Sequence, residues 1–212
     1  MTPRRIAVLI SGSGSNLQAL IDACATGRIP NAEIVAVLSN RKAAFGLERA
    51  RKVGIATEYL ALQPYLKTHH HDGKTREDYD AEVARLVLMH TPELVVLAGW
   101  MHIVSDRFLD ALNAASVPAI NLHPALPGAF DGADALQRAW DAFQRGEITK
   151  TGAMVHYVVR EVDRGEPIVV REIEMSKDED QEAFEKRVHA IEWEIIVEAT
   201  HKVLDAPNRS AR

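Results

Sequence analysis

Residues 6–27 read IAVLISGSGSNLQALIDACATG, and this stretch decides the fold. The uninterrupted apolar run at residues 6–10 is typical of a central strand that is buried on both faces. A glycine-rich loop follows, and from Asn16 the apolar residues recur at helical spacing until Gly27, a residue suited to ending a helix. The order strand, glycine loop, helix predicts the first βα unit of a parallel sheet.

The rest of the chain repeats this alternation. Apolar and β-branched runs predict further strands at residues 33–38, 56–60, 94–97, 119–122, 151–159 and 168–174. Helical spacing predicts helices at residues 45–53, 75–90, 105–112, 135–145 and 182–204. We therefore expect an α/β fold: one domain over residues 1–212 with a Rossmann-like, mostly parallel twisted sheet, helices on both faces, and a frayed tail at 206–212.

Composition limits the class of protein. The chain has 212 residues, of which 47% are hydrophobic and 26% charged, enough for a substantial globular core. The net charge of −5 argues against nucleic acid as a partner, so any phosphate must be held by a local site. The single cysteine, Cys24, cannot form an internal disulfide, and no apolar stretch has transmembrane length. We expect a cytoplasmic protein without a membrane partner.

The glycine loop predicts an anion site. Glycines let the backbone approach a phosphate, and the following helix presents unpaired N–H groups. A single phosphate at Gly14, Ser15 and Asn16 fits best, because Leu17 stands where a dinucleotide fingerprint has its third glycine. An NADP-binding module stays open, since Arg41 after the second strand could accept a 2′-phosphate, and so does a simple turn without a ligand.

A polar pair ends the strand at 119–122 and suits acyl transfer. In the extended run INLHP, alternate side chains face the same way, so Asn121 and His123 can converge while Leu122 packs inward. An amide can stabilise a developing oxyanion, and an imidazole can move a proton. The alternative is a hydrogen-bonded asparagine and histidine in a turn before Pro124.

Several motifs of the chain resemble those of a known family. INLHPALPG at 120–128, followed by VDRGEPI at 162–168, is similar to the folate-dependent formyltransferases. The motifs at 8–20, 39–57, 75–80 and 94–104 extend the resemblance over nearly the whole chain, toward members that act in purine biosynthesis. The resemblance implies transfer of the formyl group of 10-formyltetrahydrofolate to the amine of 5′-phosphoribosylglycinamide. The transfer would pass through a tetrahedral intermediate and would not need a metal.

The resemblance also implies roles for individual residues. The residues that match the family's catalytic groups are Asn121, His123 and Asp163. Those that match its substrate phosphate and ribose contacts are Gly14, Ser15, Asn16 and Glu192. Those that match its folate contacts are Arg76, Met101, His102, Ile103 and Val104. The chain departs from the family at His102, where arginine is common, in the loop at 127–134, and in the run of histidines at 69–71.

Asp163, some forty residues after His123, is expected to act on that histidine. If Asp163 lies near His123, it favours imidazolium and raises the pKa of His123 above its free value of about 6.5. The alternative is that Asp163 only shapes a turn, since D-R-G is common turn chemistry. His156, in the β-rich stretch before Asp163, either lines the cleft or is a half-buried strand residue. The segment EVDRGEP between the last two strands predicts a hairpin or a tight crossover.

Two related enzymes and a non-catalytic sensor are alternatives to this reaction. A methionyl-tRNA formyltransferase is expected to have a further C-terminal domain and basic character, and a formyltetrahydrofolate hydrolase an N-terminal regulatory domain. A sensor of phosphoribosyl ligands without activity would not need the set Asn121, His123 and Asp163. We expect small-molecule partners only, with the chain acting as a monomer or a homodimer.

Overall fold

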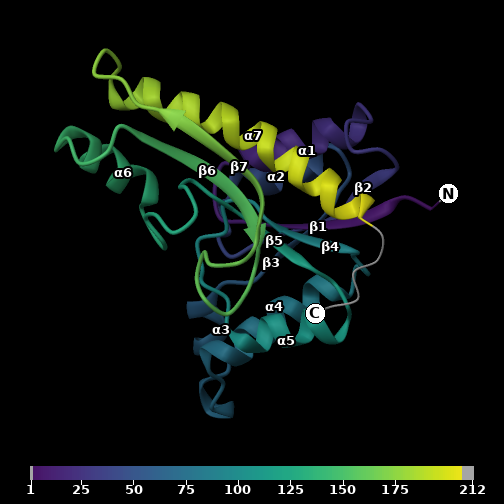
Figure 1. The fold of residues 1–212 in the computed structure, drawn as a ribbon. Helices are drawn as coiled ribbons and strands as arrows, with labels where there is room; N and C mark the ends of the chain where they lie inside the picture. Colours follow the sequence, from purple (N-terminus) through teal and green to yellow (C-terminus); the bar gives the residue numbers. More distant parts are fainter. Residues whose placement is uncertain (1, 207–212) are drawn as a thin grey trace.

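A single seven-stranded sheet organises the computed structural model, which describes residues 2–206 (Figure 1). The strand order is β3-β2-β1-β4-β5-β6-β7. The strands are β1 (Arg4–Ile10), β2 (Ala32–Ser39), β3 (Ala56–Tyr59), β4 (Leu94–Leu97), β5 (Ala119–His123), β6 (Lys150–Tyr157) and β7 (Pro167–Glu174). Pairs from β3 to β5 are parallel, whereas β6 is antiparallel to both β5 and β7. The mostly parallel α/β fold expected from the sequence is confirmed.

Helices cover both faces of the sheet (Figure 1). The helices of one face are α1 (Ser15–Ala25), α2 (Phe45–Lys52) and α7 (Gln181–Asp205). Those of the other are α3 (Leu62–Thr68), α4 (Arg76–Leu88) and α5 (Asp106–Ala114). The remaining helix, α6 (Ala135–Gln144), packs with the first turns of α7 and the end of β7 in a small third cluster.

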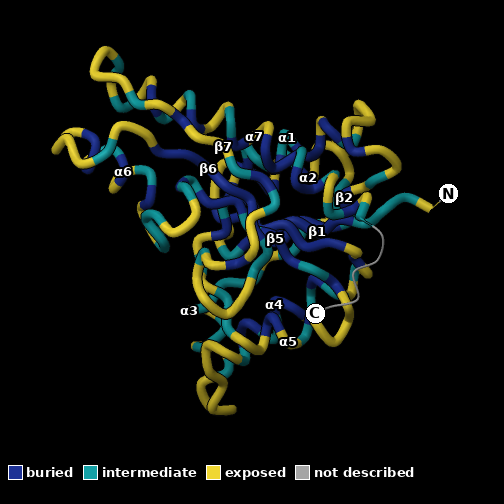
Figure 2. Tube along the Cα trace, viewed as in Figure 1, coloured by how far each residue is buried: buried dark blue, intermediate teal, exposed yellow. Residues whose placement is uncertain are grey.

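The apolar run of β1 shows why it lies centrally. Ile6, Val8 and Ile10 belong to the core beneath α1, α2 and α7, while Ala7 and Leu9 belong to the core beneath α4 and α5. All five side chains are at most 1% exposed, because successive residues of a strand point to opposite faces. The buried centre of the sheet is visible in Figure 2.

The predicted elements are all present, and one helix was missed. The segment at 62–72, for which no element was predicted, contains α3 and a short 3₁₀ turn, His70–Asp72. Its apolar residues are only partly buried, and Pro64 lies in its first turn, where proline is tolerated although it normally signals a break. The three adjacent histidines lie at this surface, with His69 3.1 Å from Asp72.

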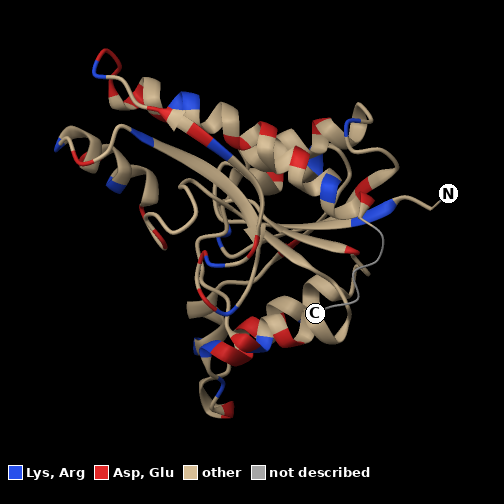
Figure 3. Cartoon of the chain, viewed as in Figure 1, with Lys and Arg blue, Asp and Glu red and all other residues tan. Residues whose placement is uncertain are grey.

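Charge lies mainly on the helices and loops, and the middle strands carry little of it (Figure 3). No helix among residues 2–206 combines the length and apolarity needed to cross a bilayer. The expected hairpin is confirmed between β6 and β7. The frayed tail expected at 206–212 falls, apart from Ala206, outside the described residues.

Candidate active site

The loops that follow β1 and β4 meet at one edge of the sheet. Both strands are parallel, so their carboxyl ends lie at the same edge, which is where ligands bind in such sheets. The Ser11 N–H donates to the carbonyl of Gly99 at 2.9 Å, and the Met101 N–H donates to Ser11 Oγ at 2.8 Å. The glycine loop and the segment 101–104 are therefore joined by direct hydrogen bonds.

The glycine loop has the geometry of an anion cradle. Gly14 caps α1 with a φ of +72°, and a Cβ added there would lie 2.6 Å from the Cα of Gly46. Both its backbone angle and the close approach of Gly46 thus require glycine. No side chain of the described residues caps α1, which leaves N–H groups of the first turn, including those of Ser15 and Asn16, open at the edge.

The three residues expected to be catalytic converge. Leu122 packs into the core, and its neighbours Asn121 and His123 face Asp163, which the hairpin between β6 and β7 carries. Asn121 Nδ2 donates to Asp163 Oδ1 at 3.3 Å, and His123 Nδ1 lies 3.4 Å from Asp163 Oδ2. His123 Nε2 is buried and has no hydrogen-bond partner among the described groups, so it is the nitrogen free to meet a substrate.

Local backbone geometry places Asp163. Its φ is +56°, a left-handed conformation that aspartate adopts more readily than most residues. Two residues later, Gly165 packs so closely on the carbonyl of Tyr157 that any Cβ would clash. The Gly132 N–H donates to Asp163 Oδ2 at 2.8 Å from the loop after β5. The D-R-G sequence therefore does shape a turn, and this turn delivers the carboxylate to His123.

His156 completes the cluster, which settles what the sequence left open. The antiparallel register of β5 and β6 places it opposite Asn121, and it is 2% exposed. His156 Nδ1 lies 2.8 Å from the Tyr157 carbonyl, which can only accept, so Nδ1 carries the hydrogen. His156 Nε2 lies 3.2 Å from Asn121 Nδ2 and 3.4 Å from Asp163 Oδ1. The sequence signal was a histidine in a buried strand, but only the register revealed its partners.

The electrostatics correct one expectation. Burial lowers the pKa of His123 below its ordinary value, and the opposing effect of Asp163 does not overcome it. The prediction that Asp163 would raise the pKa of His123 is therefore wrong in its net direction. For Asp163, burial acts to raise the pKa, but the neighbouring His156, the hydrogen bond from the Gly132 N–H and the nearby His123 outweigh it and lower the pKa.

The residues expected to contact folate lie together, but they differ in accessibility. Met101 is 70% and Ile103 55% exposed, which is unusual for apolar side chains. Val104 packs against the core. His102 instead turns inward, where its Nε2 lies 2.6 Å from Oδ1 of the buried Asp80. The role of Asp80 was not foreseen, because its partner is distant in sequence.

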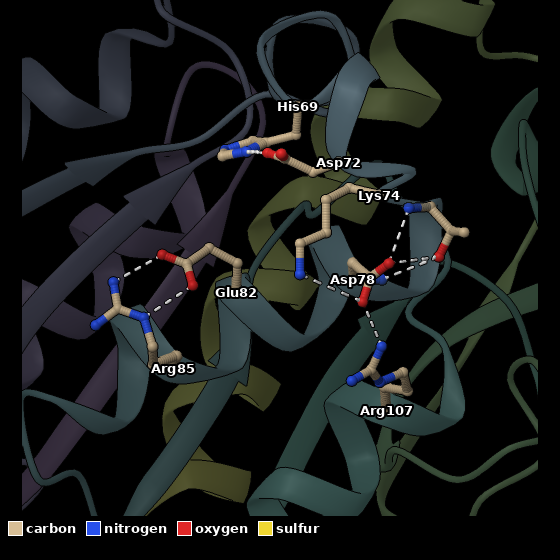
Figure 4. Close-up of polar contacts among 8 residues, drawn as sticks. His69, Asp72, Lys74, Asp78, Glu82, Arg85 and Arg107 are labelled. Atoms are coloured by element: carbon tan, nitrogen blue, oxygen red, sulfur yellow. Dashed lines mark hydrogen bonds and ion pairs between the residues drawn. The ribbon is translucent and has the colours of Figure 1, made fainter.

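Arg76 is bound to the same segment. It is the first residue of α4, and its guanidinium donates to the carbonyl of Ile103. A capping box begins α4: Thr75 accepts from the Asp78 N–H, and Asp78 accepts from the Thr75 N–H. Asp78 also pairs with Arg107 of α5, which ties the start of α4 to its neighbour (Figure 4). Arg76 therefore lies beside the segment 101–104, which was expected to contact the same folate.

Glu192 is the candidate that comes from the last helix. It lies on α7, is 6% exposed, and its Oε2 is 2.7 Å from His189 Nδ1. This hydrogen bond raises the pKa of His189. Within residues 2–206, no hydrogen bond or ion pair joins Glu192 to Gly14, Ser15 or Asn16. The contact between α7 and α1 is what brings the two regions to one side of the sheet.

Comparisons with known proteins identify the family. The family model described as formyl transferase matches residues 4–200. A phosphoribosylglycinamide formyltransferase of Schizosaccharomyces pombe is 50% identical over 200 residues, covering 94% of this chain and 96% of its own. The corresponding Saccharomyces cerevisiae protein is 47% identical over 209 residues, covering 94% and 97%. The structure of glycinamide ribonucleotide transformylase 1 from Symbiobacterium toebii matches with a TM-score of 0.82 at 34% identity, covering 94% and 87%. The chain therefore belongs to the formyl transferase family.

Proposed function

We propose that this protein transfers the formyl group of 10-formyltetrahydrofolate to the amine of 5′-phosphoribosylglycinamide, in purine biosynthesis. The observation that carries the proposal is the convergence of Asn121, His123 and Asp163 at the end of β5. The name shared by curated relatives at 50% and 47% identity supports the same reaction.

His123 is the proton carrier in this proposal. Its lowered pKa keeps the imidazole neutral near pH 7, and a hydrogen on Nδ1 toward Asp163 leaves the lone pair of Nε2 free. Nε2 can then accept the proton of the attacking amine. Asp163 stabilises the imidazolium that forms, which returns the proton to the departing nitrogen.

Asn121 is the proposed donor to the negative charge that develops on the formyl oxygen. Its Nδ2 is engaged by His156 Nε2 and Asp163 Oδ1, which leaves Oδ1 as the free atom. Each of these contacts uses one of the two Nδ2 hydrogens, so release of either contact on substrate binding would free a hydrogen to donate to the formyl oxygen. Loss of one such donor typically reduces the rate by about a hundred- to a thousandfold.

The substrates have separate places at this edge. The open N–H groups at Ser15 and Asn16 suit a phosphate, and Glu192 suits ribose hydroxyls. The exposed apolar side chains of Met101 and Ile103 suit a flat heterocycle, for which the segment 101–104 also offers backbone groups. The same assignment gives Arg76 and His102 a supporting role toward the folate, because both hold this segment.

The cellular setting follows from the same chemistry. We infer a cytosolic enzyme with small-molecule substrates, supported by the single Cys24, whose pKa burial raises to about 11 and whose thiol is therefore unreactive. We propose a monomer or homodimer of one domain over residues 1–212, with no nucleic-acid, membrane or metal partner in the reaction.

The direct test is an absorbance assay of 10-formyltetrahydrofolate consumption with and without 5′-phosphoribosylglycinamide. Consumption only in the presence of the ribonucleotide, with formylated product detected by mass spectrometry, is the expected result. Consumption without it would replace the proposal by a hydrolase. No consumption under either condition would overturn it, and binding of NADPH would then be measured.

A further inference from the structure

The loop after β5 is bonded through its backbone to Asp163. The Gly132 N–H donates to Asp163 Oδ2 at 2.8 Å, and the same oxygen lies 3.4 Å from His123 Nδ1. The loop therefore holds the carboxylate oxygen that faces His123. This loop, at 127–134, is also where the sequence departs from the usual family pattern.

The loop holds an unfavourable backbone conformation. Phe130 and Asp134 have φ values of +52° and +54°, and neither is glycine. Side chains with a Cβ adopt this region only when surrounding contacts compensate for the steric cost. Contacts from outside the loop can offset this cost and hold Gly132 at Asp163.

Arg138 of α6 makes the first contact that fixes the loop. Its guanidinium donates to the carbonyls of Phe130 and Asp131, each at 2.6 Å. The same group lies 5.9 Å from the centre of the Phe130 ring, over its face. Two charge-assisted bonds to consecutive carbonyls fix this part of the loop relative to the helix.

An ion pair is the second contact that fixes the loop, and it lies beside the hydrogen bond between Gly132 and Asp163. Arg164 Nη2 lies 2.5 Å from Asp131 Oδ2. Asp131 precedes Gly132, and Arg164 follows Asp163, so the ion pair and the Gly132–Asp163 hydrogen bond are adjacent links between the same two loops. Arg164 is 56% exposed, but Asp131 only 28%, which protects the pair partly from solvent.

We propose that Asp131 and Arg164 are positioning residues that clamp the loop to the hairpin and thereby hold Asp163 against His123. Neither is assigned contact with a substrate. The clamp keeps the Gly132 N–H on Asp163 Oδ2, which leaves the carboxylate oriented toward His123 Nδ1. This role in catalysis rests on the proposed function, whereas the clamp itself does not.

The kinetic test uses Arg164→Gln, Asp131→Asn and the charge-reversed double variant Asp131→Arg/Arg164→Asp. Each single variant should lower kcat about fivefold, the upper range for a partly exposed ion pair, with little change in either KM. The double variant should recover most of that loss, because the pair is re-formed with its charges exchanged. Arg160→Gln is the matched control: Arg160 lies on the same hairpin but pairs with Asp106 and Asp110 of α5, and its kcat should be unchanged.

A second measurement does not depend on activity. Hydrogen exchange of the Gly132 amide, followed by NMR, should accelerate in both single variants and return toward the parent rate in the double variant. If the parent enzyme lacks formyl transfer, this exchange still tests the clamp, so failure of the proposed function is distinguishable. Unchanged Gly132 exchange in the single variants, or a double variant no better than the worse single one, would overturn the proposal.

Discussion

Nε2 of His102 lies 2.6 Å from Oδ1 of the buried Asp80, although the residues on either side of His102 in the chain, Met101 and Ile103, are exposed. The other oxygen of Asp80 accepts from the Ser105 N–H at 2.8 Å, so one carboxylate binds the segment 101–104 near both of its ends. The side chains of His102 and Asp80 are 10% and 1% exposed. His102, expected to contact the folate, therefore fixes the backbone of its own segment.

This relationship predicts the effect of changing His102. In His102→Leu the buried Asp80 keeps the Ser105 N–H but loses the His102 ring, which costs about 2 kcal/mol and lowers the melting temperature by about 4–8 °C. The segment loosens, so KM for 10-formyltetrahydrofolate should rise about tenfold with kcat nearly unchanged. His102→Arg can still pair with Asp80 and should stay close to the parent. A leucine variant with parental KM and melting temperature would exclude the positioning role.

Replacing Asp163 by asparagine should separate charge from shape. Asparagine tolerates the φ of +56° found at this position and can still accept from Gly132, so the melting temperature should change little. Without the carboxylate the imidazolium of His123 loses its counter-ion, and kcat should fall about a hundredfold or more. Steady-state kinetics and thermal melts check both parts, and near-normal turnover would refute a catalytic Asp163.

The lowered pKa of His123 sets the pH dependence of the free enzyme. Because neutral His123 accepts the proton, kcat/KM should rise with pH, with the midpoint of the rise below the ordinary histidine value of about 6.5. The groups around it pull in opposite directions: Asp163 and Asp131 raise its pKa, while burial and His156 lower it. In Asp163→Asn the His123 pKa should move lower still, which a proton NMR titration of the ring measures.

The same shift has a consequence for stability. A histidine whose pKa is lower in the folded state binds its proton more readily when unfolded. Its contribution to the free energy of unfolding is present above about pH 6.5 and is lost as pH falls through that value toward the folded pKa. Urea melts at pH 7.5 and 5.5, on the parent and on His123→Gln, should show a smaller pH effect in the variant. An equal loss of stability in both would contradict the assignment.

The glycine loop allows a comparison between two neighbouring glycines. Gly14→Ala forces a Cβ against Gly46 at a φ of +72°, so the loop should distort and KM for 5′-phosphoribosylglycinamide should rise at least about tenfold. Gly12→Ala is the matched control, since a Cβ there meets nothing within 4 Å. Isothermal titration with the ribonucleotide separates binding from turnover. Equal affinities for the two variants would remove the phosphate site from this loop.

Much of the fold could be read from local pattern. The run at 6–10 is buried on both faces, and the helices at 75–90 and 182–204 were placed within a few residues, because apolar periodicity is set by neighbours along the chain. Asn121 and His123 were paired correctly for the same reason, since alternation along one strand is a local property. The helix α3 was not predicted because it buries too little apolar surface for its apolar residues to show a clear helical spacing.

Other features came only from contacts between distant parts of the chain. His156 meets Asn121 through an antiparallel register that periodicity does not specify, and Asp80 meets His102 across 22 residues. The direction of the pKa shift of His123 depends on how deeply it is buried, and charge proximity alone gave the wrong sign.

The sequence by itself therefore determined the order of most strands and helices, the glycine loop and the candidate pair Asn121 and His123, since each is encoded within a short window. The tertiary structure alone decided which candidate side chains meet Asp163 and which, like His102, hold the backbone in place. Burial, strand register and loop contacts arise only when distant segments pack together, and they set the electrostatics of the site.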